Sequence, residues 1–546
     1  MTSTSRLRGR SRAIAIAAAS LLLLGLAAML LRTGPPPASA SSERPNIVFL
    51  LTDDQTKRDL NKTVMPRTME WIRKKGVSFK RAYISTPLCC PARATFLTGQ
   101  YAHNSEVRQN TAPEGGYERF VAEGLDETNL PVWLHGAGYH TTHIGKYLNF
   151  YGDGVTSEDD PPPEVPPGWD EWFGYVGSPS SRYWGYILNE NGDLRQYGDP
   201  SLPDDQQDPE NYQTDVYANL ALEAIKDRAA AGPDAPPFYL NVNFSAPHQT
   251  APPAPRHAGK FTKAALPKDP SYNEPGMSDK PAFLQAQTPK IGPGREFLSI
   301  TKPHRRRLST LYTVDTAVKK IVTKLKDKGL LSNTYVVFAS DSGFFQGQHR
   351  LVTGKYLAYD PSARVPLVIR GPGIPRGETS GELVTNADFA PTVLDIGDAS
   401  PNGGFIQDGR TLLPFAEEPI LRTSRPLLIE GFGAGDLDQE PPVVPSGGAS
   451  IAEASVGAPA YAAIRTQRWL YVEYGPTASY PEGAIELYDM KKDPYQLHSL
   501  HEKPAYETVR GVLALQLTKL RECKGGTSQT VPTSCGKHRS DPEPPG

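Results

Sequence analysis

The sequence predicts an α/β fold with a small antiparallel subdomain at its C-terminal end. Short apolar runs recur along the chain, and each leads into polar residues. One long segment carries an apolar stripe at helical spacing. Past about residue 400, glycine and proline become more frequent and short β-like runs appear. The 546 residues suffice for one large domain and a smaller one.

Residues 1–40 form a predicted targeting segment. Four arginines between residues 6 and 12 precede an apolar run over residues 13–31, and Ala38-Ser39-Ala40 has the small residues of a cleavage site. We therefore expect a secreted protein that is cleaved near Ala40. The apolar run is long for a signal peptide, so an uncleaved membrane anchor is the alternative, and only in that case do we expect a membrane partner.

The charge balance excludes a nucleic-acid-binding surface as the main function. Lysine and arginine total 58, while aspartate and glutamate total 60. A nucleic-acid-binding chain would show a basic excess. The targeting segment carries only basic charge, so its removal makes the net charge of −2 more negative.

The first expected strand covers residues 47–51 and ends in two acidic residues, Asp53 and Asp54. An uninterrupted apolar run of this length is typical of a buried parallel strand. Further expected strands, some of them interrupted by polar residues, lie at residues 139–144, 238–244, 335–339 and 365–369. Ligands of open α/β sheets bind at the carboxyl ends of the strands, so the polar residues that follow them predict a site built on loops.

The longest expected helix lies near residues 308–325, where apolar residues recur every three or four positions. Residues 159–168 and 251–304 are rich in proline, and we expect long loops there that border a pocket. An aromatic cluster fits either a core or a platform for a sugar, and it consists of Trp169, Trp172, Tyr175, Tyr183, Trp184 and Tyr186. Runs at 469–472 and 485–489 predict strands of the C-terminal subdomain.

The expected organisation is a targeting segment over 1–40, a catalytic domain over 41–400, an α+β subdomain over 401–523 and a flexible tail over 524–546. Cys523 and Cys535 are placed to close a small disulfide loop after export. That pairing leaves Cys89 and Cys90 as free thiols.

Residues 88–99 contain the most specific motif of the chain. They match Cys-x-Pro-x-Arg, from Cys89 to Arg93, followed four residues after the arginine by Leu-Thr-Gly. A buried cysteine pair or a metal thiolate site is the alternative. Adjacent cysteines are poorly placed to chelate one metal, and no second pair lies nearby.

This motif resembles that of the type I sulfatases, in which the first cysteine is oxidised to formylglycine by a generating enzyme that acts on the unfolded chain. The resemblance covers most of residues 44–500 and is greatest for the N-acetylglucosamine-6-sulfatase and extracellular endosulfatase branch. Gly145-Lys146-Tyr147-Leu148-Asn149 and Pro167-Gly168-Trp169 indicate that branch. It implies an alkaline-phosphatase-like mixed sheet sandwiched by helices.

The resemblance also implies a role for each site residue. Cys89 becomes the formylglycine and Arg93 stabilises it. Lys146 and Lys355 hold the sulfate, His248 is the acid for the leaving oxygen, and His349 lines the pocket. Calcium is the implied metal, and its implied ligands are Asp53, Asp54, Asp341 and Ser342.

These residue types suit the cleavage of a sulfate ester. A formylglycine hydrate has two hydroxyls on one carbon, of which one attacks sulfur and the other later loses its proton to expel the sulfate. A hard divalent cation lowers the pKa of the hydrate and is bound by oxygen ligands. The expected substrate is a sulfated carbohydrate resembling N-acetylglucosamine 6-sulfate, or an aryl sulfate.

The chain departs from the family pattern at three positions. Ala92 stands where serine is usual. Leu148 replaces a histidine found in many sulfatases, with Asn149 as its substitute. Ser342 stands where asparagine is usual, which leaves the fourth metal ligand open.

Three other functions remain open from the sequence. They are an arylsulfatase of broad specificity, a phosphoester hydrolase on the same fold, and a catalytically silent carbohydrate-binding protein. Joint retention of Cys89, Arg93, Lys146, His248 and Lys355 argues against the silent protein.

Overall fold

A mixed sheet of 11 strands forms the centre of residues 45–546 in the computed structural model. The described residues are 44–177, 182–433, 458–477, 481–525, 535 and 541–545. The chain divides into the units Met1–Arg44 and Pro45–Gly546, and the 11-stranded sheet belongs to the second. The predicted targeting segment lies outside the described residues. In the part of the chain that is described, no helix has the length and hydropathy needed to cross a membrane.

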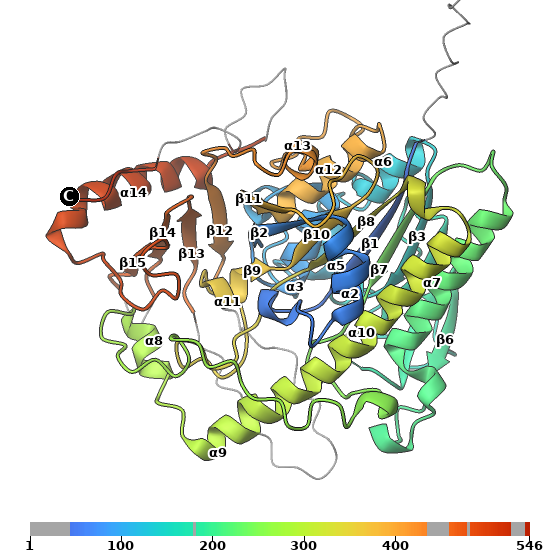
Figure 1. Cartoon of the computed structure of the whole chain (residues 1–546), viewed down its shortest axis with the longest axis horizontal. Coiled ribbons are helices and arrows are strands. Elements are labelled where there is room, and N and C mark those ends of the chain that lie inside the picture. The colour runs from blue at the N-terminus through green and yellow to red at the C-terminus, as the bar shows by residue number, and fades with distance from the viewer. Residues whose placement is uncertain are drawn as a thin grey trace, which may run out of the picture. The chain divides into compact units, whose positions relative to one another are not determined.

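The strand order of the large sheet is β11-β2-β10-β8-β1-β7-β3-β4-β5-β6, and β9 pairs with β2 (Figure 1). Its strands are β1 (Asn46–Thr52), β2 (Val77–Tyr83), β3 (His140–Gly145), β4 (Glu171–Val176), β5 (Tyr186–Glu190), β6 (Asp193–Tyr197), β7 (Phe238–Asn243), β8 (Thr334–Ser340), β9 (Arg364–Val365), β10 (Leu367–Arg370) and β11 (Thr379–Thr385). The central strands β8, β1, β7 and β3 are parallel to one another. β10 runs antiparallel to β8, which makes the sheet mixed.

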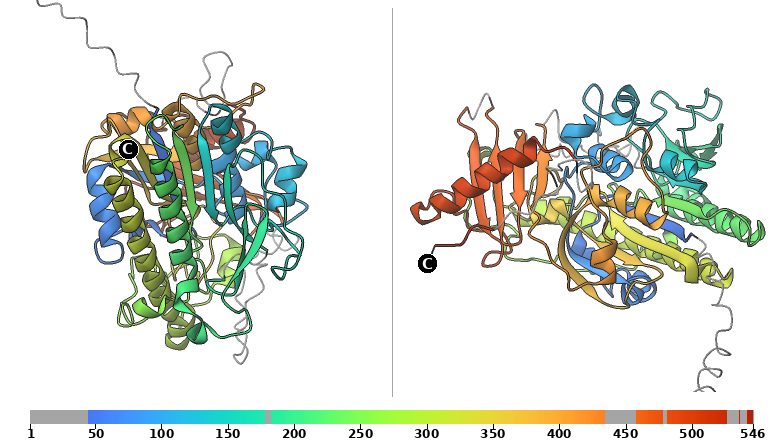
Figure 2. Two further views of the ribbon diagram at one scale, coloured as in Figure 1. Left: turned by 90° about the vertical axis from the view of Figure 1, so that its right-hand side faces the viewer. Right: turned by 90° about the horizontal axis from the view of Figure 1, so that it is seen from above.

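Helices cover both faces of this sheet. The helices are α2 (Pro66–Trp71), α3 (Cys89–Thr98), α4 (Ala102–Ser105), α5 (Gly116–Ala122), α6 (Leu130–Gly136), α7 (Gln213–Ala230), α8 (Ala282–Gln287), α9 (Pro293–Glu296), α10 (Lys302–Asp327), α11 (Asp360–Ala363), α12 (Phe389–Ile396), α13 (Leu413–Glu417) and α14 (Glu507–Arg521). α7 and α10 lie side by side on one face (Figure 2). α3, α6 and α12 contribute to the core on the other face.

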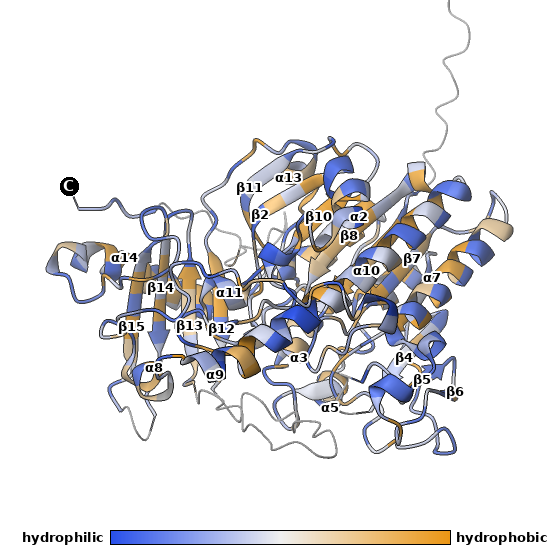
Figure 3. Ribbon diagram, turned by 60° about the horizontal axis from the view of Figure 1, so that its bottom comes forward, coloured by the Kyte–Doolittle hydropathy of each residue, from blue (hydrophilic) through white to orange (hydrophobic). Residues whose placement is uncertain are grey.

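The alternation of side chains along β1 explains why this strand is apolar throughout. Phe49 and Leu51 belong to the core cluster under α3 and α12, whereas Val48 and Leu50 belong to the cluster under α7 and α10. A strand with helices on both faces has no side that faces water. Hydrophilic residues appear instead on the outer helices α7 and α10 (Figure 3).

The predicted C-terminal sheet is confirmed. Four antiparallel strands pair in the order β12 (Leu427–Gly431), β13 (Tyr461–Arg465), β14 (Trp469–Tyr474) and β15 (Ala484–Asp489). Leu513 and Leu517 of α14 pack in one core cluster with residues of β13 and β14. Cys523 and Cys535 form the expected disulfide, and Cys89 and Cys90 are free.

Two local predictions need correction. The run 365–369 is not one strand: Pro366 separates β9 from β10 because proline has no N–H to donate to a ladder. The stretch 251–304 is not loop throughout, since it contains α8, α9 and the first turn of α10. The six residues of the aromatic cluster defined above are buried, so they form core and not a sugar platform.

Candidate active site

Polar side chains gather at the carboxyl edge of the central parallel strands. Asp53 and Asp54 follow β1, and Asp341 follows β8. Lys146 follows β3, and the loop with His248 follows β7. Because these four strands are adjacent and parallel, their carboxyl ends share one edge of the sheet.

Three carboxylates converge at this edge. One oxygen of each of Asp53, Asp54 and Asp341 lies within 4.8 Å of the others, and all three residues are buried. The backbone N–H of Asp54 donates to Asp341 Oδ1 at 3.1 Å. Ser342 donates its hydroxyl to Asp54 Oδ1 at 2.6 Å. An all-oxygen donor set of this kind suits a hard divalent cation.

Cys89 lies at the first position of helix α3, beside these carboxylates. Its Sγ is 3.8 Å from Asp53 Oδ1, and Lys355 Nζ donates to it at 2.8 Å. Sγ also groups with Asp53 and His248, one atom of each lying within 4.8 Å of the others. The Cys89 side chain is therefore in contact range of the acidic cluster and of two basic residues.

Four basic side chains face the carboxylates. Lys146 Nζ is 2.6 Å from Asp53 Oδ2, and Lys355 forms an ion pair with Asp54. Arg93 lies 2.8 Å from Asp341 and 3.5 Å from Asp53. His248 Nε2 is 3.7 Å from Asp54 Oδ2. Each of these buried basic side chains therefore has a carboxylate partner, so none of the four is buried as an isolated charge.

The basic side chains decide the protonation of two of the acids. Burial by itself raises the pKa of Asp53, but Lys146, His248, Arg93 and Lys355 outweigh it and hold that pKa well below its usual range. Burial likewise raises the pKa of Asp54, and Lys355 and His248 bring it below the usual value. Both carboxylates are thus anionic near neutral pH.

His349 lies against other partners. Its Nδ1 is 2.7 Å from Glu274 Oε2, and its ring stacks on Tyr359 at 4.1 Å between centroids. His349 itself belongs to the loop that follows β8, and its side chain is buried. These contacts fix the ring of His349, and its place in the pocket lining stays a prediction.

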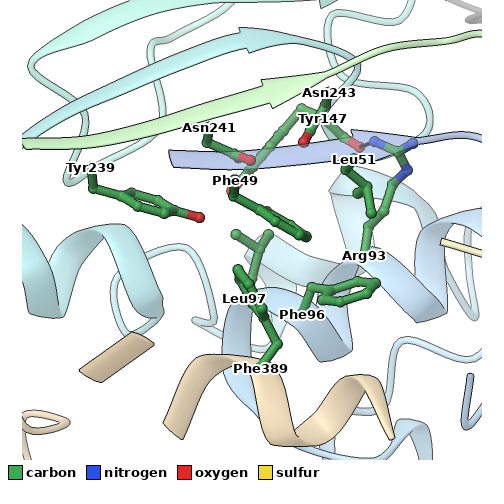
Figure 4. Close-up of a pocket in the computed structure, with 10 residues that line it drawn as sticks. All are labelled: Phe49, Leu51, Arg93, Phe96, Leu97, Tyr147, Tyr239, Asn241, Asn243 and Phe389. Carbon is green, nitrogen blue, oxygen red and sulfur yellow. Dashed lines mark hydrogen bonds between the residues drawn. The ribbon is translucent and has the colours of Figure 1, made fainter. Parts of the chain in front are cut away.

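A small cavity lies beneath the site, between the sheet and α3 (Figure 4). Phe49, Phe96 and Phe389 give it an apolar side, and Asn243 contributes a polar side chain. Of the nine residues predicted for catalysis and metal binding, only Arg93 lines it. The acidic cluster lies outside the cavity, so the cavity is not the substrate site.

Sequence reasoning missed two residues that hold the site from behind. Arg307 of α10 donates to the backbone carbonyls of Asp54 and Pro247. Tyr183 donates its hydroxyl to the carbonyl of His248 at 3.0 Å. Arg307 stands in a run of three arginines, 305–307, that resembles a solvated helix face. Helical spacing puts Arg307 four positions before Leu311 and seven before Val314, so the apolar stripe of this helix is the signal that could have found it.

Comparison with known proteins decides the family. The family model described as Sulfatase matches residues 45–399. The chain belongs to the sulfatase family. It is a sulfuric ester hydrolase with the alkaline-phosphatase-like fold expected from its sequence.

Two curated relatives of this sulfatase come from animals. It is 33% identical over 517 residues to the N-acetylglucosamine-6-sulfatase of Homo sapiens, covering 92% of this chain and 89% of the relative. It is 35% identical over 412 residues to the extracellular sulfatase SULF-1 homologue of Drosophila melanogaster, covering 74% of this chain and 34% of the relative.

Solved structures share the fold. One, described as a complex with its substrate D-glucosamine-2-N,6-O-disulfate, is 23% identical, with a TM-score of 0.64 and coverage of 88% of this chain and 98% of that chain. A phosphonate monoester hydrolase of Agrobacterium radiobacter is 24% identical, with a TM-score of 0.60 and coverage of 88% and 95%. At these identities the likeness concerns the fold alone.

Proposed function

We propose that this sulfatase uses a formylglycine derived from Cys89 and a calcium ion to hydrolyse 6-O-sulfated N-acetylglucosamine or a closely related sulfated sugar. One observation carries the proposal. Cys89 Sγ lies between Lys355 Nζ and Asp53 Oδ1, next to three converging carboxylates. This arrangement puts a modifiable side chain, positive charge and an oxygen-rich cation site within contact range of one another.

The donor set fits calcium. Asp53, Asp54 and Asp341 supply carboxylate oxygens, and the depressed pKa values of Asp53 and Asp54 keep those two anionic. Ser342 Oγ is hydrogen-bonded to Asp54, so it supports a ligand and lies beside the site. Bound calcium would neutralise sulfate oxygens and lower the pKa of the formylglycine hydrate.

The burial of Cys89 fits modification before folding. Only 1% of the Cys89 residue is exposed in the folded chain. A generating enzyme would need that side chain to be accessible, which the unfolded chain provides. The formylglycine-generating enzyme is therefore the proposed partner during biosynthesis.

The chain's own residues divide the remaining tasks of the reaction. Lys355 contacts residue 89, and Lys146 and Arg93 pair with its neighbour Asp53. All three would bind sulfate oxygens as negative charge develops there. His248 Nδ1 lies 2.8 Å from the carbonyl oxygen of Gln249, which fixes the N–H of a neutral ring at Nδ1. The Nε2 atom then faces Asp54 and is available to carry the proton for the leaving oxygen.

The names of the relatives support a sugar substrate. The human relative is named an N-acetylglucosamine-6-sulfatase, whereas the Drosophila relative is named an extracellular sulfatase, without a substrate. An arylsulfatase of broad specificity is the second candidate, because a relative from Volvox carteri, 31% identical over 526 residues, is named arylsulfatase.

Relative rates test these candidates. The purified protein is given N-acetylglucosamine 6-sulfate, 4-nitrophenyl sulfate and 4-nitrophenyl phosphate, and kcat/KM is measured for each. A clear preference for the sugar sulfate is expected. A preference for the aryl sulfate would favour the broad arylsulfatase, and a preference for the phosphate would favour a phosphoester hydrolase.

We also propose export with cleavage near Ala40. The Cys523–Cys535 disulfide supports this proposal, because such bonds persist in oxidising compartments. Amino-terminal sequencing of the secreted protein tests it. A mature chain that begins close to residue 41 is expected, whereas an intact residue 1 would indicate the uncleaved membrane anchor.

A further inference from the structure

Arg307 connects three segments of the candidate active site from behind. Only 2% of the surface of Arg307 is exposed, although the residue belongs to the outer helix α10. Nη1 donates to the carbonyl of Pro247 at 2.9 Å, and Nη2 donates to the carbonyl of Asp54. The guanidinium lies over the ring of Phe344, 4.2 Å from its centroid.

Each of these contacts belongs to the end of a different strand. Asp54 follows β1, Pro247 follows β7 and Phe344 follows β8. Pro247 directly precedes His248, and Phe344 lies two residues after Ser342. One rigid planar group therefore sets the spacing between the acidic cluster and the histidine.

The backbone of Asp54 needs this support. Its φ is +65°, a left-handed conformation that non-glycine residues adopt only where the surroundings hold it. The side-chain oxygen Oδ1 of the same residue accepts from Ser342 and pairs with Lys355. Arg307 fixes the main chain of a residue whose side chain faces the centre of the site.

The histidine segment is held at two points. Arg307 binds the carbonyl before His248, and Tyr183 donates to the carbonyl of His248 itself at 3.0 Å. The 3.7 Å separation of His248 Nε2 from Asp54 Oδ2 thus depends on Arg307 at both ends.

We propose that Arg307 is a positioning residue that keeps His248 in register with the acidic cluster, so that one side chain sets both the binding of calcium and the protonation of the leaving group. This inference rests on the proposed function. Lysine cannot replace arginine here, because a single ammonium on a flexible stem does not span two carbonyls in fixed directions.

The test compares Arg307→Lys with Arg306→Lys, a half-buried neighbour on the same helix. Calorimetry of calcium binding to the metal-stripped proteins gives the affinity without using activity. We expect Arg307→Lys to weaken calcium about tenfold, as loss of an outer partner of a metal site does. Arg306→Lys should bind calcium as the wild type does.

Reaction rates at saturating calcium test the proposed effect of Arg307 on protonation of the leaving group. A sugar sulfate has a poor leaving group that needs a proton, whereas 4-nitrophenyl sulfate needs little help. Arg307→Lys should lower kcat on the sugar sulfate about 10- to 100-fold, with a much smaller loss on the aryl sulfate. A merely structural role would lower the melting temperature and both rates equally.

The outcomes separate this inference from the proposed function. A wild type that neither binds calcium nor cleaves the sugar sulfate would refute the proposed function first. If the wild type behaves normally while Arg307→Lys has unchanged calcium affinity and an unchanged ratio of the two rates, the role of Arg307 is refuted.

Phe344→Leu is the substitute variant if Arg307→Lys does not fold. It removes the aromatic ring beside the guanidinium and keeps both hydrogen bonds of Arg307. Calcium affinity and the rate ratio should then shift in the same direction as expected for Arg307→Lys, but by less. An unchanged Phe344→Leu would then overturn the inference.

Discussion

Lys355 Nζ lies 2.8 Å from Cys89 Sγ and also pairs with Asp54, so one ammonium joins the modifiable residue to the acidic cluster. Burial lowers the pKa of Lys355, but Asp54 and Cys89 outweigh it and raise that pKa well above its usual value. The ammonium is therefore charged at neutral pH. The side chain of residue 89 is therefore in contact with a positively charged ammonium group, that of Lys355.

The first prediction concerns the fate of Cys89. Oxidation of its thiol to an aldehyde should reduce the mass of the tryptic peptide by about eighteen daltons, as expected for that step. Mass spectrometry of active enzyme measures the shift. Cys89→Ala should abolish turnover, and a fully active enzyme with an unmodified thiol at residue 89 would contradict the proposal.

Cys90 provides the matched control. Burial raises the pKa of its thiol to about 12, so it remains a neutral group inside the core. Cys90→Ala should therefore retain most of the activity on sugar sulfate. A loss as large as that of Cys89→Ala would mean that Cys90 also takes part in the reaction.

The second prediction concerns Ser342. Asparagine at this position offers a side-chain carbonyl to calcium, while serine only donates its hydroxyl to Asp54. Ser342→Asn should lower the calcium concentration for half activity by about threefold to tenfold, if one neutral ligand contributes about 1 kcal/mol. Calcium titration of the metal-stripped proteins measures the change.

Ser342→Ala is the companion variant. It removes the hydrogen bond to Asp54 without adding a ligand, so it should require more calcium than the wild type. Coinciding titration curves for the wild type and both variants would mean that residue 342 does not influence the metal.

The third prediction concerns the disulfide between Cys523 and Cys535, which closes a loop with a sequence separation of 12. The double variant with serine at both positions should lose about 3 kcal/mol of unfolding free energy, as the chain-entropy model gives for a loop of this size. Denaturant unfolding measures the loss. Both residues are far in sequence from Cys89, and kcat under native conditions should remain unchanged.

The fourth prediction concerns pH and His103 of α4. Burial lowers the pKa of His103, but its hydrogen bond and ion pair with Glu430 outweigh burial and raise that pKa from its ordinary value of 6.5 to about 9. The raised pKa means that the pair stabilises the fold fully below about pH 6.5 and ceases to do so above about pH 9.

His103→Gln isolates this contribution. The difference in unfolding free energy between wild type and variant should be largest near pH 6 and shrink as the pH passes through about 9. Urea unfolding across that range measures it. A difference that does not change with pH would show that His103 contributes by packing alone.

Much of the site follows from short segments of sequence. The motif from Cys89 to Arg93 spans five consecutive residues, and the acidic pair directly follows the apolar run that forms β1, so both can be recognised from neighbouring residues. The parallel strands β1 and β8 were predictable from their largely apolar runs, since a strand covered on both faces has no side that faces water.

Other residues gain their role only through contacts that are distant in sequence. The ring of His349 is held by Glu274 and Tyr359, which lie 75 positions before it and 10 positions after it. Pro366 divides an apolar run into β9 and β10, which both pair with β2, because proline has no N–H to donate to the ladder between them.

The sequence by itself determined the family motif, the acidic pair, the alternation of strands and helices, and the cysteines available for a disulfide, because each depends on neighbouring residues. Only the tertiary structure decided what the buried arginine of 305–307 contacts. Arg307 contacts Asp54, 253 positions earlier, and the ring of Phe344 on a third strand end. Its role comes from where three strands end in space, and no run of neighbouring residues encodes that distance.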